Sequence, residues 1–242
     1  MKMGTIYGVG LGPGDPDLMS VRADRLLRGA RHVAYFRKPG RTGQARKIVG
    51  GMIPGDAVEF PMEYPVTTEI PVTDPRYNEL LAAFYKDCTK RLKELSDQGK
   101  DVVVLCEGDP FFYGSFMHLY SRLRNEAPVE VVPAITGMSG AWTATGDPIT
   151  WGDDVLTVLV GTLPEDLLAT RMAQTDALVV MKIGRNIDKV KRALKTAGLY
   201  DRAWIVEYAQ MPNQTVTRLC EACDKITPYF SIIIVHGQGR RP

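Results

Sequence analysis

The stretch Asp101–Gly114 constrains the fold more strongly than any other part of the chain. Its first part, Val102–Leu105, is an unbroken apolar and mostly β-branched run, which is typical of a strand buried on both faces of a parallel sheet. Gly108-Asp109-Pro110 then ends the strand, because proline lacks a backbone N–H and glycine lets other atoms approach the backbone. The apolar residues that follow have helical spacing: Phe112, Phe116, Leu119 and Leu123. We therefore expect a strand, a tight turn and a helix, as in an α/β fold whose ligands bind at the carboxyl ends of strands.

Alternating strand and helix patterns extend along the whole chain. The other strands expected in the first half are Thr5–Val9, Val33–Phe36, Asp56–Phe60 and Val129–Val132. A long helix is expected from Asp74 to Asp97, after an irregular stretch that begins at Pro61. The strands expected in the second half are Val155–Val160, Ala177–Met181, Ala203–Glu207, Gln214–Leu219 and Phe230–Val235. Only the brief segment Cys220–Ile226 separates the last two strands, which predicts a mixed, partly antiparallel sheet there.

Composition and charge argue against several classes of protein. The chain has 242 residues, of which 45% are hydrophobic and 24% are charged, as expected of a globular protein with a substantial core. The formal net charge of +2 is too small to favour nucleic-acid binding. No apolar run reaches the roughly 18 residues that a membrane helix needs. The chain begins directly with a strand pattern, so we expect no signal peptide and a cytoplasmic protein.

Cysteine and histidine are not arranged as metal ligands. Of the four cysteines, Cys220 and Cys223 form a lone Cys-x-x-Cys pair, with no second pair and no histidine nearby. The three histidines, His32, His118 and His236, are scattered. We therefore expect no metal site and four reduced thiols.

A glycine-rich segment, Gly8–Asp15, follows the first expected strand. Its four glycines at alternate positions indicate backbone that turns tightly or lies against a ligand. The dinucleotide fingerprint Gly-x-Gly-x-x-Gly is not met, because its third glycine would be Pro13 or Asp15. The second strand ends in Arg37 and Lys38 rather than in an acidic residue. These features argue against an NAD site, and an NADP-dependent oxidoreductase with Arg37 on the 2′-phosphate is kept as an alternative.

Several of these strand ends resemble those of the tetrapyrrole methylase family, the S-adenosylmethionine (SAM) enzymes that methylate corrin and siroheme precursors. The most specific motifs are Gly-x-Gly-x-Gly-Pro-Gly-Asp at Gly8–Asp15 and Gly-Asp-Pro-x-x-Tyr-Gly at Gly108–Gly114. The resemblance covers essentially the whole chain. The extended first loop, the long helix and the strand end Met181-Lys182 are similar to the branch of the family that methylates precorrin-2 at C20 in cobalamin biosynthesis. The chain differs from many members at Ala134 and Tyr208, where those members have glycine and arginine.

The resemblance implies a fold, a cofactor and a set of binding residues. The fold would be two αβα domains, residues 1–134 and 135–242, with a cofactor cleft between them. SAM would be held largely by backbone groups and converted to S-adenosylhomocysteine (SAH). The residues that match the family's cofactor site are Pro13, Gly108, Asp109, Phe112, Thr136, Gly137, Met181, Ala209 and Ser231. Family members are commonly homodimers, so we expect a homodimer.

The substrate that the resemblance implies is a tetrapyrrole with many carboxylates, which arginine side chains bind well. Between Arg22 and Lys47 the sequence has nine basic residues and one acidic residue. The candidates for substrate binding, near the end of the second strand, are Arg37, Lys38, Arg41 and Arg46. Asp15, Glu107 and Tyr113 are candidates by position for a base that removes a proton after methyl transfer. A cobalt-loaded substrate, another tetrapyrrole, and a non-catalytic carrier of anionic tetrapyrroles stay open as alternatives.

Overall fold

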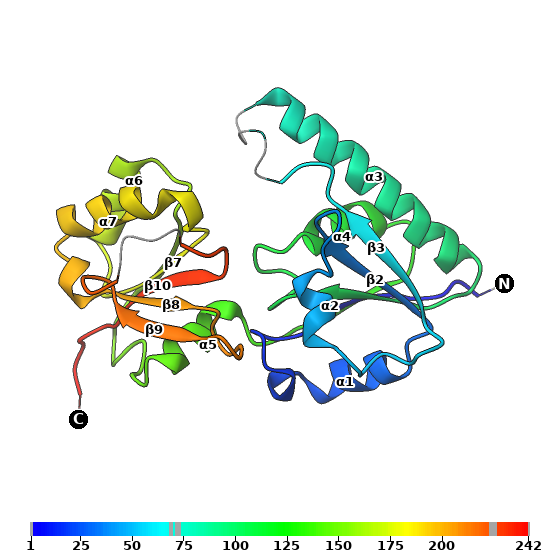
Figure 1. Cartoon of the computed structure of the whole chain (residues 1–242), viewed down its shortest axis with the longest axis horizontal. Helices are drawn as coiled ribbons and strands as arrows, with labels where there is room; N and C mark the ends of the chain where they lie inside the picture. Colours follow the sequence, from blue (N-terminus) through cyan, green and yellow to red (C-terminus); the bar gives the residue numbers. More distant parts are fainter. Residues whose placement is uncertain (1, 68–69, 71–73, 223–226, 242) are drawn as a thin grey trace. The chain divides into compact units, whose positions relative to one another are not determined.

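A computed structural model describes residues 2–67, 70, 74–222 and 227–241. The chain divides into two compact units, Met1–Thr136 and Gly137–Pro242. Each unit has its own central sheet with helices on both faces (Figure 1). The α/β class with one sheet per half of the chain is therefore confirmed.

The N-terminal unit contains a parallel sheet with the strand order β3-β2-β4-β1-β5. Its strands are β1 Ile6–Gly10, β2 His32–Arg37, β3 Val58–Glu63, β4 Val102–Cys106 and β5 Val129–Val132. β4 lies at the centre of the sheet, and all five of its residues are buried. The burial on both faces that its unbroken apolar run predicted is confirmed.

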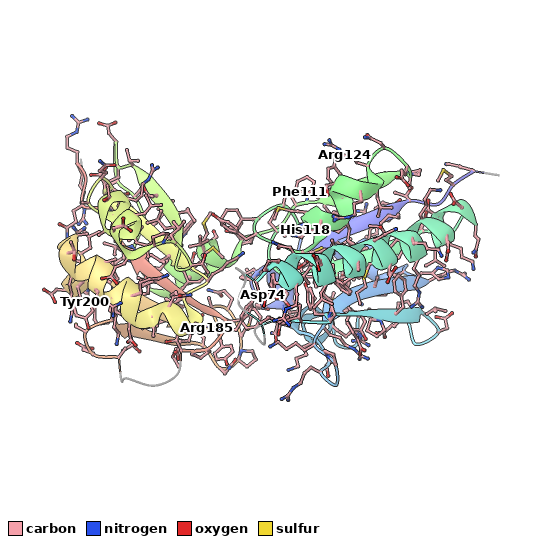
Figure 2. All side chains as sticks on the ribbon, turned by 90° about the horizontal axis from the view of Figure 1, so that it is seen from above. Asp74, Phe111, His118, Arg124, Arg185 and Tyr200 are labelled. Carbon is pink, nitrogen blue, oxygen red and sulfur yellow. The ribbon has the colours of Figure 1, made fainter. Side chains whose placement is uncertain are left out.

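Helices cover both faces of this sheet. α1 (Val21–Arg28) and α2 (Gln44–Ile48) pack on one face, whereas α3 (Pro75–Asp97) and α4 (Phe116–Leu123) pack on the other. Two of the helices begin at residues that cap them. The Ser20 hydroxyl accepts a hydrogen bond from the Ala23 N–H at 3.1 Å, and the Asp74 carboxylate accepts one from the Arg76 N–H at 3.0 Å, at the start of α3 (Figure 2). The expected long helix is confirmed.

Two local expectations in this unit are wrong. Pro61 does not end its strand, because β3 continues to Glu63. β3 pairs with β2 on one side only, and an edge strand tolerates the missing N–H of proline. Phe112 does not belong to a helix, because α4 begins at Phe116 and the residues before it form an irregular turn. The middle of the Pro-rich stretch, residues 68–69 and 71–73, lies outside the described residues.

The C-terminal unit contains a mixed sheet with the strand order β6-β7-β10-β8-β9. Its strands are β6 Leu156–Val160, β7 Ala177–Met181, β8 Trp204–Glu207, β9 Thr215–Arg218 and β10 Ser231–Val235. β6 and β7 are parallel, and the remaining pairs are antiparallel, as predicted. α6 (Glu165–Met172) and α7 (Ile187–Thr196) cover one face, and α5 (Gly137–Ala144) covers the other.

Different residues lie at the two ends of the strands in this sheet. β7 and β8 run in the same direction, and β10 runs antiparallel to both. The carboxyl ends of β7 and β8, at Met181 and Glu207, therefore lie beside the start of β10 at Ser231. The start of β8 at Trp204 and the end of β9 at Arg218 lie at the opposite end of the strands.

No helix in the described ranges is both long and apolar enough to cross a membrane. In the same residues, His, Cys, Asp and Glu side chains form no group of three or more that could hold a metal ion.

Candidate functional site

In the N-terminal unit, the two glycine-rich turns are hydrogen-bonded to each other. The N–H of Gly108 donates to the carbonyl of Gly12 at 2.8 Å, and the N–H of Leu11 donates to the carbonyl of Cys106 at 2.9 Å. Gly12 and Gly108 both have positive φ angles, +79° and +62°, which glycine adopts without steric cost. The turns after β1 and β4 therefore form one continuous surface at the carboxyl ends of these strands. Pro13 is buried beside this surface.

Gly10 marks the point where three chain segments meet. A Cβ atom on this residue would lie 2.6 Å from the Cβ of Ala134, 2.9 Å from the Gly108 carbonyl oxygen and 2.9 Å from Cδ of Pro110. These distances are well below van der Waals contact. The turn after β4 and the segment after β5 thus pack directly on the end of β1, as the glycine spacing predicted for backbone in close approach.

Asp109 joins the turn after β4 to the segment after β5. One carboxylate oxygen accepts a hydrogen bond from the Phe111 N–H, and the other accepts one from the Ala134 N–H, both at 2.9 Å. The side chain therefore fixes the shape of the turn in addition to any contact it makes with a ligand. The sequence motif indicated that Asp109 matters, but it gave no sign that its partner is Ala134.

Among the described residues, four other than glycine have left-handed backbone, and all four follow the carboxyl end of a strand. They are Tyr113, Lys182, Tyr208 and Gln210, with φ between 52° and 59°. Such conformations cost free energy for residues with a Cβ, and they are concentrated at functional sites. Tyr113 follows β4, Lys182 follows β7, and Tyr208 and Gln210 follow β8, in or next to the segments on which the family resemblance rests.

In the C-terminal unit, the predicted cofactor residues Met181, Ala209 and Ser231 lie at one edge of the sheet. Met181 and Ala209 belong to the apolar cluster on which α5 packs. Ser231 is buried at the start of β10, and its hydroxyl donates to the carbonyl of Pro228 at 2.9 Å. Gly137, the first residue of α5, lies next to Ile232 of β10, since a Cβ built on it would be 3.7 Å from the Ile232 side chain.

One residue at this edge was missed by the sequence analysis. The Gln210 amide donates to the Gly140 carbonyl at 3.0 Å and so ties the segment after β8 to α5. Gln210 follows Ala209, which the family resemblance assigns to the cofactor, but it is not itself among the predicted site residues. No sequence signal connects it to Gly140, which is seventy positions away.

The three candidates for a base differ in their surroundings. The Asp15 carboxylate accepts from the Asp17 N–H at 2.9 Å and caps the short 3₁₀ helix Pro16–Leu18. Tyr113 is exposed and packs edge-on against Phe112. Glu107 is exposed, yet desolvation by the surrounding protein raises its pKa to about 7, and a 3.0 Å hydrogen bond from the Ala45 N–H opposes this shift.

Two of the four predicted substrate-binding residues are engaged by carboxylates. Arg46 donates two hydrogen bonds to Glu59, at 2.7 and 2.8 Å, and Arg37 donates to Glu63 at 2.9 Å. The hydrogen bond from Arg46 holds the pKa of Glu59 below its ordinary value. Lys38 and Arg41 are exposed, in and next to the loop after β2.

The chain is similar to proteins of known function over its whole length. It matches the family model of tetrapyrrole (corrin/porphyrin) methylases over residues 5–222. It is 48% identical over 240 residues to a precorrin-2 C(20)-methyltransferase from Sinorhizobium sp, with 99% of this chain and 98% of the relative covered. It is 29% identical over 241 residues to a cobalt-precorrin-2 C(20)-methyltransferase from Salmonella typhimurium, with 97% of each chain covered.

A solved structure shows the same fold. The uroporphyrin-III C-methyl transferase from Thermus thermophilus, complexed with SAH, matches with a TM-score of 0.67 and 25% sequence identity. The match covers 96% of this chain and 97% of that structure.

Proposed function

Because the chain belongs to the tetrapyrrole methylase family, we propose that it transfers a methyl group from SAM to C20 of precorrin-2, giving precorrin-3A and SAH. The observation that carries this proposal is the full-length similarity to the Sinorhizobium enzyme of that name. The aligned region includes both glycine-rich turns and both sheets, so the similarity is not confined to a shared cofactor motif.

The residues at the strand ends fit a cofactor that carries no phosphate. The glycine-rich turn after β1 leads into a single turn of 3₁₀ helix, and the Asp15 carboxylate already occupies the N-terminus of that helix. A phosphate would be repelled there, whereas phosphate sites use open helix N-termini. The side chains assigned to the cofactor, among them Thr136, Met181 and Ser231, are uncharged apart from Asp109.

The residues that the family resemblance assigns to the cofactor are distributed over both units. Pro13, Gly108, Asp109, Phe112 and Thr136 come from the N-terminal unit, and Gly137, Met181, Ala209 and Ser231 come from the C-terminal unit. In the N-terminal unit the glycines let the ligand reach backbone N–H and carbonyl groups. In the C-terminal unit Met181 and Ala209 offer an apolar surface that suits the adenine ring.

The mechanism that we propose relies on positioning. When bound, SAM supplies an activated methyl group that a nucleophilic meso carbon can accept, so the protein has mainly to align the reacting atoms and exclude water. Such alignment accounts for about 7–11 kcal/mol of rate acceleration in favourable cases. The braced turn after β4 provides the rigidity, because Asp109 and the Gly12–Gly108 bridge fix it from two sides.

A base is needed to take a proton from the macrocycle after transfer. Of the three candidates, we favour Glu107, because a pKa of about 7 suits proton acceptance near neutral pH and the residue is exposed. Asp15 is engaged as a helix cap, and Tyr113 is kept as the alternative.

For the substrate carboxylates we favour Lys38 and Arg41. Both are exposed, and no carboxylate lies within ion-pair distance of either in the described part of the chain. Arg37 and Arg46 are weaker candidates, because part of their positive charge and of their donors is already used by Glu63 and Glu59. By family resemblance we further propose a cytoplasmic homodimer, which sedimentation analysis and fractionation of the source cells would test.

The metal state of the substrate is the main alternative, because the Salmonella relative is named for cobalt-precorrin-2. The decisive experiment compares initial rates of SAH release with precorrin-2, cobalt-precorrin-2 and uroporphyrinogen III at equal SAM. We expect the highest kcat/KM with metal-free precorrin-2. A preference for the cobalt form would assign the chain to the other branch, and turnover of uroporphyrinogen alone would refute the C20 proposal.

A further inference from the structure

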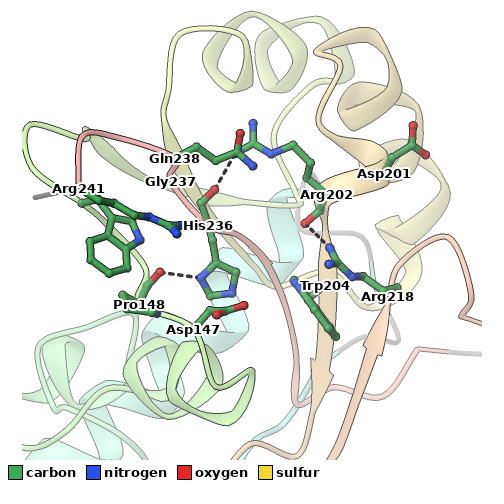
Figure 3. A pocket seen from close by; sticks show the side chains of 11 residues that line it. Asp147, Pro148, Asp201, Arg202, Trp204, Arg218, His236, Gly237, Gln238 and Arg241 are labelled. Carbon is green, nitrogen blue, oxygen red and sulfur yellow. Dashed lines mark hydrogen bonds between the residues drawn. The ribbon is translucent and has the colours of Figure 1, made fainter.

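A pocket of about 320 Å³ lies in the C-terminal unit, at the end of the strands opposite to Met181 and Ser231 (Figure 3). Its walls come from the start of β8, the end of β9, the segment before β6 and the segment after β10. We call it the arginine pocket, because Arg202, Arg218 and Arg241 all line it. None of the residues assigned to methyl transfer takes part in it.

The three arginines have few partners among the residues that the structure describes. Arg202 donates one hydrogen bond, to the His236 carbonyl at 2.7 Å, and Arg218 donates a long one, to the Arg202 carbonyl at 3.4 Å (Figure 3). Within the described ranges, none of the three lies within ion-pair distance of a carboxylate. Each guanidinium has five N–H donors, so most of the donors remain available to a ligand.

Two of these guanidinium groups lie over indole rings. Arg218 lies over Trp204 with its Cζ 4.1 Å from the ring centroid, and Arg241 lies over Trp151 at 4.5 Å. Stacking uses the face of a guanidinium and leaves the N–H groups at its edge free to bind a planar anion. The tryptophans therefore orient the arginines without neutralising their charge.

The walls of the pocket are fixed by hydrogen bonds. The Nδ1 of His236 donates to the Pro148 carbonyl at 2.9 Å, since a carbonyl can only accept. One carboxylate oxygen of Asp154 accepts from the Trp151 N–H at 2.8 Å and from the Gly239 N–H at 3.2 Å. The segment that carries Arg241 is therefore tied to the segment that carries Trp151, and the pocket does not have to form when a ligand arrives.

The charge of the lining favours an anion. Three arginines stand against two carboxylates, those of Asp147 and Asp201, which gives a net charge of one positive unit with His236 neutral. The volume is at the lower end of the roughly 300–1,000 Å³ range of small-molecule sites, and it is too small for a whole tetrapyrrole.

We propose that the arginine pocket is a second binding site, separate from the methyl-transfer site, for a small anion that carries carboxylate or phosphate groups. The donors at the edges of Arg202, Arg218 and Arg241 bind the anionic group. Asp147 and Asp201 accept hydrogen bonds from any hydroxyl or ammonium group of the same ligand. The proposal does not depend on the proposed reaction, because it rests on contacts within the C-terminal unit.

The tryptophans provide a direct readout, because two of the three in the chain line the pocket. The experiment titrates the full chain with sodium citrate and, separately, with sodium pyrophosphate at constant ionic strength, and follows tryptophan fluorescence. We expect a saturable change with at least one probe, and the stronger response identifies carboxylate or phosphate as the ligand group. Arg218→Gln and the exposed Arg241→Gln should each weaken binding roughly tenfold or more, the loss expected for a charged donor pair.

The control is Arg192→Gln, which removes an equal charge from the same unit, at an exposed position paired with Glu165. It should bind the probes as the unchanged protein does, and all variants should bind SAM with unchanged Kd. The proposal is overturned if the fluorescence change is linear in probe concentration, or if it is the same in Arg218→Gln, Arg241→Gln and the control. Circular dichroism verifies that each variant is folded. If Arg218→Gln does not fold, the measurement with Arg241→Gln still tests the proposal.

Discussion

Gly10 illustrates how single residues set the geometry of the proposed cofactor site. Two segments, the turn after β4 and the segment after β5, approach it so closely that no side chain fits, and both carry residues assigned to the cofactor. The glycine spacing in the sequence predicted close approach of backbone. It did not identify Ala134 and Pro110 as the neighbours, because these are set by how β5 and the turn after β4 pack on β1.

The first prediction concerns this position. Gly10→Ala should lower the free energy of unfolding by about 1–3 kcal/mol, because the new methyl group overlaps backbone and Cβ atoms that cannot easily move. It should also weaken SAM binding in a calorimetric titration. The matched control is Gly55→Ala, where nothing lies within 4 Å of the new Cβ and little change is expected. Equal stability of the two variants in urea denaturation would contradict this account of the turn.

The second prediction concerns Glu107. If its carboxylate removes the proton, kcat should rise with pH through about 7, because only the ionised form accepts a proton. Glu107→Gln should lower kcat by a factor of about 100 or more and abolish this rise, while leaving the Kd for SAM nearly unchanged. A pH–rate profile of the variant that keeps both its height and its shape would exclude Glu107 as the base and direct attention to Tyr113.

At the scale of elements, much of the architecture was predictable from the sequence. The buried run of β4, the long α3 and the mixed C-terminal sheet were expected because an unbroken apolar run, apolar residues at helical spacing and a short connection are each visible in the sequence. The continuation of β3 through Pro61 was not predictable, because a proline is tolerated only on an edge strand and strand order is not written in the local sequence. The hydrogen bonds of Asp109 to Ala134 and of Gln210 to Gly140 were missed for the same reason, since they join distant segments.

The third prediction tests the connection that Asp109 makes between the turn after β4 and the segment after β5. Asp109→Ala removes the acceptor for two backbone N–H groups and should cost about 1–3 kcal/mol of stability. Asp109→Asn retains one acceptor oxygen and should lose less. Both variants should bind SAM more weakly in calorimetry. An Asp109→Ala protein that binds SAM with unchanged affinity would remove Asp109 from the cofactor site and leave it a purely structural role.

The fourth prediction concerns the ion pair between Arg46 and Glu59, which joins α2 to the edge strand β3. The hydrogen bonds from Arg46 lower the pKa of Glu59 below its ordinary 4.5, so the pair stabilises the fold above that pH and loses its effect as the pH falls through the lowered value. Glu59→Gln should therefore cost of the order of 1 kcal/mol at neutral pH and less at an acidic pH below 4.5. Urea denaturation at both pH values measures the difference. Glu94→Gln, at an exposed site 4.0 Å from Lys90, is the control and should show no such pH dependence.

At the scale of the whole molecule, two units with different sheets supply two sets of strand ends. The first set offers braced, glycine-rich backbone, and the second offers an apolar surface flanked by left-handed residues. The sequence motifs located both sets, because the family's most specific residues lie at strand ends. They did not indicate the arginine pocket, whose members come from four segments without a shared motif.

The central claim is methyl transfer from SAM to C20 of precorrin-2, and one measurement tests it directly. The protein is incubated with precorrin-2 and SAM labelled with ¹³C in its methyl group, and the product is examined by NMR. We expect one labelled methyl group per macrocycle, attached at C20, and an equal amount of SAH. A label at another carbon, or an unlabelled macrocycle in the presence of folded protein that binds SAM, would contradict it.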